Sequence, residues 1–393
     1  MSGALKRDEW ETVRLGDVIT SAPVLKCGDG SYPILSMTMH DGIVYQSERF
    51  KKDLASKDKS GYKIVKPGQL VVGFPIDEGV LYIQRYAESG IMSPAYTVWD
   101  VDYTYLDKDY FELALHGPRS MKYYASKLRG STARRRSLPT PTFLALPLPL
   151  PPLDVQRRIA ETLDKVTELI TLRKTQLKKL DELVKARFVE MFGDPVINPK
   201  SWETAPLSAL ILNANNGMAR RGKDADGSIV LRLVELQNGF IDYSAPNRIC
   251  LNETEKKRYE LVDNDFLFAR VNGNPDSVGR CAVFKGIGEP VFHNDHIIRV
   301  HFDETKLNGC FTSVLLNSDY GKRQMREQIK TSAGQYTISQ DGIGVIMTIL
   351  PPMELQNQFA AFVEQTDKSK VIIQQSLDAL ETLKKSLMQE YFG

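Results

Sequence analysis

The sequence has no long apolar run. Hydrophobic residues make up 42% of its 393 positions, but they are dispersed, and the first ten residues contain no apolar segment. A helix that crosses a membrane needs about 20 consecutive apolar residues, and a secretory signal needs an apolar core near the N-terminus. We therefore expect a chain that is neither membrane-spanning nor secreted, and we expect it in the cytoplasm.

Cysteine is also scarce. The four cysteines lie far apart, without the paired spacings of zinc ligands. They are Cys27, Cys250, Cys281 and Cys310. This pattern favours free thiols in a reducing compartment over a disulfide framework or a metal site.

Acidic residues are missing from one stretch. No Asp or Glu occurs between Leu113 and Leu153, although the formal net charge of the whole chain is only +2. The cations of this stretch are Arg119, Lys122, Lys127, Arg129, Arg134, Arg135 and Arg136. Such concentrated positive charge is typical of a surface that faces phosphates. A solvated basic face is the alternative.

One segment of the sequence occurs twice. It covers residues 151–193 and again 351–393, with a constant offset of 200. Identical pairs include Gln156/Gln356, Ala160/Ala360, Leu177/Leu377, Leu180/Leu380, Leu183/Leu383 and Phe192/Phe392. Each copy starts with two prolines, which can open a helix but not interrupt one, and neither interior contains Gly or Pro. Each copy therefore predicts one helix of about 60 Å that acts as a spacer.

Apolar residues recur in both copies with heptad spacing. They are Ile159, Leu163, Val166, Ile170, Leu177, Leu180 and Val184 in the first copy and Val363, Ile373, Leu377, Leu380 and Leu387 in the second. This seam predicts a coiled coil, with packing of each helix on its own domain as the alternative. Arg173, Arg187, Lys370 and Lys384 interrupt the seam.

The remaining sequence forms two stretches of similar plan. Residues 10–150 carry strand-like runs at 32–37, 62–65, 69–74, 80–83 and 95–99, separated by Gly and Pro turns. In the second stretch Trp202-Glu203-Thr204 repeats Trp10-Glu11-Thr12, and residues 229–234 and 259–262 match 32–37 and 62–65. We predict an α+β fold with two similar, largely β units at 1–150 and 194–350 and long helices at 151–193 and 351–393.

The second stretch offers polar candidates of its own. They are Arg220, Arg221, Lys223, Arg270, Asn272, Asn274, Arg280, Gln335 and Tyr336. Arg, Asn and Gln can contact base edges with two hydrogen bonds, so these residues are candidates for DNA contacts. The alternative is that they are ordinary loop residues.

Catalytic motifs are weak. Residues 217–223 have the glycine spacing and the lysine of a phosphate-binding loop, but Asp224 stands where a Ser or Thr would hold magnesium. His293 and His296 lie beside Asp295 without a further ligand nearby, so core or loop histidines are favoured over a metal site. The chain is expected to lack a catalytic site and a metal site.

Several segments resemble a known family. Residues 149–159, 180–183, 190–195 and 198–202 are similar to the central region of the specificity subunit of Type I restriction-modification enzymes. Residues 90–96 and 331–335 resemble recurring segments of its target recognition domains. Residues 133–136 depart from the Gln-containing stretch that residues 334–336 retain, which leaves open whether both loops contact DNA in the same way.

The resemblance implies a function. Two target recognition domains would each read half of a split DNA site, and the long helices would form an antiparallel pair that spaces them and docks two methyltransferase subunits. Those subunits would bring S-adenosylmethionine, and restriction subunits would bring ATP and magnesium, so no cofactor is expected on this chain. The alternative is a DNA-acting enzyme, a nuclease or a self-sufficient methyltransferase, with a diverged active site.

Overall fold

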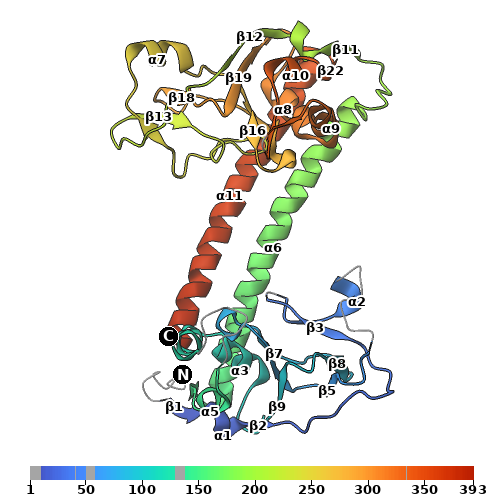
Figure 1. Cartoon of the computed structure of the whole chain (residues 1–393), viewed down its shortest axis with the longest axis vertical. Helices are drawn as coiled ribbons and strands as arrows, with labels where there is room; N and C mark the ends of the chain where they lie inside the picture. The colour runs from blue at the N-terminus through green and yellow to red at the C-terminus, as the bar shows by residue number, and fades with distance from the viewer. Residues whose placement is uncertain (1–9, 40, 50–57, 129–137, 333) are drawn as a thin grey trace. The chain divides into compact units, whose positions relative to one another are not determined.

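The computed structural model describes residues 10–39, 41–49, 58–128, 138–332 and 334–393. The chain forms two compact units, the first assembled from two separate stretches and the second from one continuous stretch. Unit 1 comprises Met1–Lys174 and Gln375–Gly393, and unit 2 comprises Thr175–Gln374. Each unit therefore holds one globular part and a portion of both long helices (Figure 1).

Unit 1 is built around a four-stranded antiparallel sheet with the order β2-β9-β6-β7. Its elements are β1 (Glu11–Arg14), α1 (Leu15–Val18), β2 (Ile19–Ser21), β3 (Leu35–Met37), β4 (Ile43–Tyr45), α2 (Gln46–Arg49), β5 (Lys63–Val65), β6 (Leu70–Val72), η2 (Ile76–Glu78), β7 (Leu81–Ile83), β8 (Gly90–Met92), β9 (Thr97–Val101), α3 (Lys108–Leu115), α4 (Pro118–Lys127), α5 (Thr140–Leu144) and β10 (Pro147–Leu150). The buried side chains of Leu70, Leu81 and Trp99 join those of Tyr110 and Phe111 on α3 in one core. Helix α3 thus covers one face of the sheet.

Unit 2 repeats this plan with the sheet order β12-β19-β15-β17. Its elements are β11 (Glu203–Pro206), η4 (Leu207–Ala209), β12 (Ile211–Asn216), β13 (Ser228–Leu231), β14 (Arg248–Ile249), α7 (Glu253–Tyr259), β15 (Phe266–Ala269), β16 (Val271–Asn272), η5 (Pro275–Ser277), β17 (Cys281–Val283), β18 (Val291–His293), β19 (Ile297–Phe302), α8 (Gly309–Asn317), α9 (Asp319–Glu327), β20 (Lys330–Ser332), β21 (Gln335–Thr337), α10 (Gln340–Gly344) and β22 (Met347–Leu350). The ladder β1–β10 of unit 1 has its counterpart in β11–β22. The expected mixed fold of two similar units is confirmed.

The expected match between residues 62–65 and 259–262 survives only in part. In unit 1 the first segment forms β5, which pairs with β8. In unit 2 Tyr259 ends α7, and the second segment forms a single antiparallel bridge, between Glu260 and Phe292 of β18.

The two long helices begin and end where the sequence indicates. They are α6 (Leu153–Phe192) and α11 (Met353–Phe392). At the start of α6 the carbonyl of Pro152 accepts from the backbone N–H of Gln156 at 3.0 Å. At its end Gly193 has φ +81°, a conformation that favours glycine. The prolines and the glycine thus limit the helix at both ends.

Portions of α6 and α11 contact each other inside each unit, running in opposite directions. In unit 1 Leu163 belongs to the same core as Phe392, and Arg173 Nε donates to Ser376 Oγ at 3.2 Å. In unit 2 Val184 and Val363 share a core. The continuous coiled coil itself remains a prediction.

Burial along the expected seam is uneven. Seven of its residues are buried: Ile159, Leu163, Val166, Ile170, Val184, Val363 and Leu377. Five are half-buried: Leu177, Leu180, Ile373, Leu380 and Leu387. Interrupting cations find polar partners, since Lys370 Nζ lies 2.8 Å from Asp181 within unit 2. Partial burial opposes the charge of Lys370, yet its pKa is raised because Asp181 and Asp367 hold the ammonium group.

The structure also bears on the cysteines and on membrane spans. All four cysteines are free. Within the described ranges, none of the helices combines the length and the apolar character that a membrane span requires.

Candidate nucleic-acid interface

A small three-stranded sheet in unit 2 brings together polar residues that are far apart in the sequence. Its order is β16-β21-β20. Asn272 on β16 pairs with Tyr336 on β21, and Ser332 on β20 pairs with Gln335. The candidates Asn272 and Tyr336 therefore lie on one local structure, although they are 64 positions apart in the sequence.

Arg270 connects this sheet to a neighbouring turn. Its carbonyl accepts from the backbone N–H of Ile338 at 2.9 Å, and its guanidinium donates to the carbonyl of Asp295 at 3.1 Å. Arg221 approaches the same turn, because its guanidinium lies 2.7 Å from the Asp295 carboxylate and 3.1 Å from Nε2 of His296. Arg221 and Arg270 thus meet at one turn beside the small sheet.

Arg220 is held by an acidic partner. Its guanidinium makes two hydrogen bonds to the Glu255 carboxylate, at 3.0 and 2.8 Å. These bonds raise the pKa of Arg220 and lower the pKa of Glu255. Lys223, three residues further on, is exposed. Arg220 and Arg221 also line a small hollow of about 130 Å³.

The asparagines of the β15–β17 loop shape that loop with their side-chain oxygens. Asn272 Oδ1 accepts from the backbone N–H of Asn274 at 2.9 Å, and Asn274 Oδ1 accepts from that of Asp276 at 3.0 Å. Asn274 thereby caps η5. Among the residues that the structure describes, neither side-chain NH₂ group has an acceptor, so both are available to an external one.

Arg280 does not join the other candidates. It is half-buried, its guanidinium donates to the carbonyl of Leu233, and burial lowers its pKa. These contacts favour a structural role for Arg280 at the start of β17.

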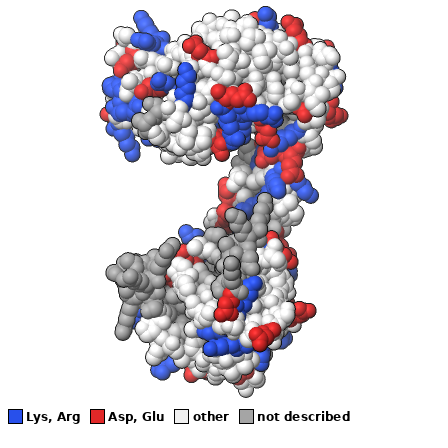
Figure 2. All heavy atoms as spheres, turned by 45° about the vertical axis from the view of Figure 1, so that its right-hand side comes forward, with Lys and Arg blue, Asp and Glu red and all other residues white. Residues whose placement is uncertain are grey.

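The basic stretch of unit 1 lies partly on helix α4. Arg119, Lys122 and Lys127 are exposed on this helix. Arg134, Arg135 and Arg136 lie outside the described residues. The face shown in Figure 2 carries basic side chains in groups, with acidic side chains beside them.

The two tyrosines among these cations point into the protein. Tyr123 OH donates to the carbonyl of Thr142 at 2.8 Å. Tyr124 is fully buried, its OH donates to the carbonyl of Leu115 at 3.2 Å, and burial raises its pKa. Both rings therefore serve packing and are not placed to stack on bases.

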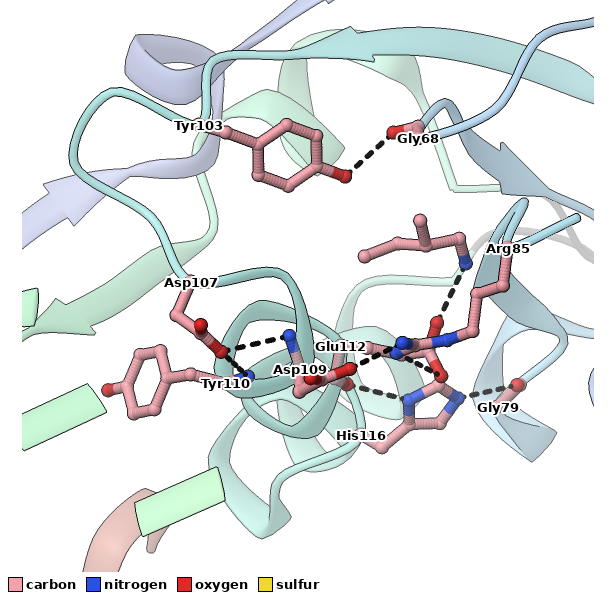
Figure 3. Close-up of polar contacts among 10 residues, drawn as sticks. Gly68, Gly79, Arg85, Tyr103, Asp107, Asp109, Tyr110, Glu112 and His116 are labelled. Carbon is pink, nitrogen blue, oxygen red and sulfur yellow. Dashed lines mark hydrogen bonds and ion pairs between the residues drawn. The ribbon is translucent and has the colours of Figure 1, made fainter. Parts of the chain in front are cut away.

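Polar contacts fix the β6–β7 loop of unit 1 to helix α3 (Figure 3). His116 follows α3, with Nδ1 2.8 Å from the carbonyl of Glu112 and Nε2 3.0 Å from that of Gly79. Arg85, just after β7, forms ion pairs with Asp109 and Glu112 on α3. The loop and the strand after it are thus held against the helix.

This loop is a feature that the sequence reasoning missed. It corresponds to the β15–β17 loop of unit 2. Each loop joins the edge strand of its four-stranded sheet, β7 or β17, to the neighbouring strand, β6 or β15. Gly79 and Gly279, again 200 residues apart, end the two loops with φ +81° and +78°. The repeated offset of these glycines was the signal that could have identified the pair of loops.

The weak catalytic motifs take other roles. Gly217 packs against the backbone of His293 and Asn294, and Met218 forms a bridge to Asn294, so residues 217–218 lie in extended pairing. His293 is buried, its Nδ1 lies 3.1 Å from the carbonyl of Tyr259, and burial lowers its pKa to about 4. Among the residues with described positions, no group of three or more His, Cys, Asp or Glu could hold a metal ion.

Comparison with known proteins gives consistent matches. Residues 7–182 match the family model described as Type I restriction modification DNA specificity domain. The StySPI specificity subunit of Salmonella potsdam is 27% identical over 289 residues, which cover 69% of this chain and 62% of that subunit. The EcoKI specificity subunit of Escherichia coli K12 is 24% identical over 270 residues, which cover 64% and 58%. The matched stretches thus span less than two thirds of either subunit.

Solved structures share the fold. A chain of a type I R-M system superposes with a TM-score of 0.58 at 15% identity, covering 98% of this chain and 97% of the other. The S subunit from M. genitalium superposes with a TM-score of 0.57 at 12% identity, covering 100% and 97%. Residues 7–182 thus match a Type I restriction modification DNA specificity domain, and the chain is similar to Type I restriction enzyme specificity subunits in sequence and in fold.

Proposed function

We propose that the chain recognises DNA sequence for a Type I restriction-modification complex. Each unit would read one half of a bipartite, non-palindromic site. The observation that carries the proposal is the convergence of Arg270, Asn272 and Tyr336 on one small sheet of unit 2. Amide and guanidinium groups at such a place can hydrogen-bond to base edges in the major groove.

The repeated fold supports a bipartite target. The two units share a strand order but differ in their loops and in the side chains those loops carry. Units with one framework and different surfaces would contact two different half-sites. The proposed domains are 1–150 and 194–350 for recognition, and 151–193 and 351–393 for spacing.

The chain itself is proposed to be non-catalytic. Two methyltransferase subunits would dock on the long helices and supply S-adenosylmethionine, while restriction subunits would supply ATP and magnesium. The complex would act in the cytoplasm, where it methylates host DNA and defends the host against foreign DNA.

Methylome sequencing of a strain with and without the gene tests this proposal. We expect adenine methylation at a split, non-palindromic motif that disappears with the gene. A motif that persists without the gene, or a continuous palindrome, would contradict the proposal.

Assays with purified components test the enzymatic alternative. We expect the chain to methylate site DNA only together with methyltransferase subunits. Methylation or cleavage of DNA by the lone chain would instead establish a DNA-acting enzyme.

A variant tests the small sheet directly. Asn272→Ala should relax discrimination in the second half-site, because a good bidentate base contact contributes about 1–3 kcal/mol. Asn238→Ala, at an exposed asparagine elsewhere in unit 2, is the matched control. Equal discrimination by the wild type and both variants would exclude Asn272 from base recognition.

A further inference from the structure

The β6–β7 loop of unit 1 and the β15–β17 loop of unit 2 are equivalent in detail. Val72 pairs with Leu81 where Phe268 pairs with Cys281, so the loops contain residues 73–80 and 270–280. Both include a 3-10 turn, η2 or η5, that precedes the positive-φ glycine. A Cβ on Gly79 would meet Met121 of α4, and one on Gly279 would meet Met325 of α9. Each loop therefore packs on the second helix of the corresponding helix pair of its own unit, which is α4 after α3 in unit 1 and α9 after α8 in unit 2.

The two loops present opposite chemistry. The loop of unit 2 carries the guanidinium and amide groups of Arg270, Asn272 and Asn274. The loop of unit 1 contains no cation and no amide side chain. It carries a large apolar side chain, Phe74, that is 54% exposed to solvent. An exposed phenyl ring forgoes the free energy of burial, so an apolar contact partner would stabilise it.

Phe74 is held in place. Its ring contacts that of Tyr96 edge-on, with centroids 5.6 Å apart and planes at 63°. The loop is closed by the hydrogen bond from Gly73 N–H to the Val80 carbonyl at 2.8 Å, and Gly79 is anchored by His116. A short loop with these contacts presents the ring in one position and loses little conformational freedom on binding.

The surrounding charges restrict what the ring can approach. Asp77 and Glu78 follow Phe74 in the same loop, and carboxylates repel phosphates. Helix α4, which packs on this loop, carries exposed Arg119 and Lys122. Phosphates would therefore be contacted by α4, while the loop would face base edges. The apolar group that bases present in the major groove is the thymine methyl.

We propose that Phe74 contacts a thymine methyl group in the half-site read by unit 1, an inference that rests on the proposed function. Unit 1 would read its half-site through apolar contact where unit 2 uses amide and guanidinium groups.

Uracil substitution tests the proposal with the reconstituted complex of the chain and its methyltransferase subunits. Each thymine of the half-site read by unit 1 is replaced in turn by uracil, which keeps base pairing but lacks the methyl group. We expect affinity to fall about fourfold at one position, the equivalent of one buried methylene at about 0.8 kcal/mol. Phe74→Ala should bind the thymine and uracil duplexes equally well.

Controls separate the possible results. Phe240→Ala, at a ring of 60% exposure in unit 2, should retain the preference for thymine. Phe74→Ala should lower the thermal unfolding temperature only slightly, because the ring is 54% exposed and loses only its contact with Tyr96. If Phe74→Ala weakens binding to both duplexes equally and reduces DNA bending, the ring acts as a wedge between bases and the methyl contact is refuted.

If no uracil position affects binding, the proposal fails while the proposed function stands. A wild-type complex without sequence preference refutes the proposed function itself.

Discussion

The side-chain oxygen of Gln156 accepts a hydrogen bond from the backbone N–H of Asp107 at 2.8 Å. Gln156 is fully buried at the start of α6, and its side-chain NH₂ donates to the carbonyls of Tyr105 and Pro151. The same arrangement recurs in unit 2, where Gln356 accepts from the backbone N–H of Asn308 at 2.8 Å. One amide in each unit therefore joins the start of a long helix to the start of a core helix.

Replacing Gln156 by Leu should destabilise unit 1. The substitution retains most of the volume but leaves buried backbone groups without a partner, which costs about 1–3 kcal/mol. Denaturant unfolding of the full chain would measure the loss. Gln365→Ala, at an exposed position of α11, is the control and should leave the transition unchanged. Equal stability of the wild type and Gln156→Leu would disprove the role of this amide.

Two leucines of α6 should respond differently to truncation. Leu163 is 1% exposed in the core of unit 1, and Leu183 is 48% exposed. Leu163→Ala should lower the free energy of unfolding by about 2–5 kcal/mol, because it opens a cavity. Leu183→Ala should lower it by well under that amount. Similar effects of both substitutions, measured by thermal unfolding, would contradict the burial assigned to Leu163.

Unit 2 should lose stability in acid through His293. Its pKa is about 4 in the folded state, below the ordinary value of 6.5, because burial disfavours the imidazolium. Between these values the unfolded chain binds a proton that the folded chain does not. The stability of the folded state that depends on a neutral His293 is therefore fully present above pH 6.5. It is lost as the pH falls toward 4, and the free energy of unfolding drops by on the order of 3 kcal/mol in total.

Unfolding measured across this pH range checks the effect of His293. His293→Gln should flatten the dependence of stability on pH, whatever its effect on absolute stability. A slope that is identical in the variant would assign the acid sensitivity to other groups.

Arg119 and Lys122 should set part of the salt dependence of DNA binding. Each phosphate contact contributes nearly one unit to the slope of log K against log salt. Replacing both residues by Ser should therefore flatten the slope by about two units. Lys285→Ser, at an exposed lysine of unit 2, is the control. An unchanged slope would remove α4 from the phosphate-facing surface. The same substitution at Arg134, Arg135 and Arg136 tests the rest of the basic stretch.

Local sequence signals predicted the helices well and the polar site only in part. The pair Pro151-Pro152 and Gly193 mark the two ends of α6, because proline and glycine restrict or free the backbone at their own positions. The pairing of Asn272 with Tyr336 could not be foreseen, because it depends on strands from distant parts of the chain. The buried position of Tyr124 could not be foreseen for the same reason, since only tertiary packing shows that its ring is inside.

The position of Phe392 has a consequence for synthesis on the ribosome. This ring is buried in the core of unit 1, 5.3 Å from the ring of Tyr110, and Gly117 leaves the space for it. Unit 1 is translated first, yet its core cannot close until residues 375–393 have emerged. Unit 2, made of one continuous stretch, can close earlier. Of the two units, the one whose first stretch leaves the ribosome earlier is thus the later to finish folding.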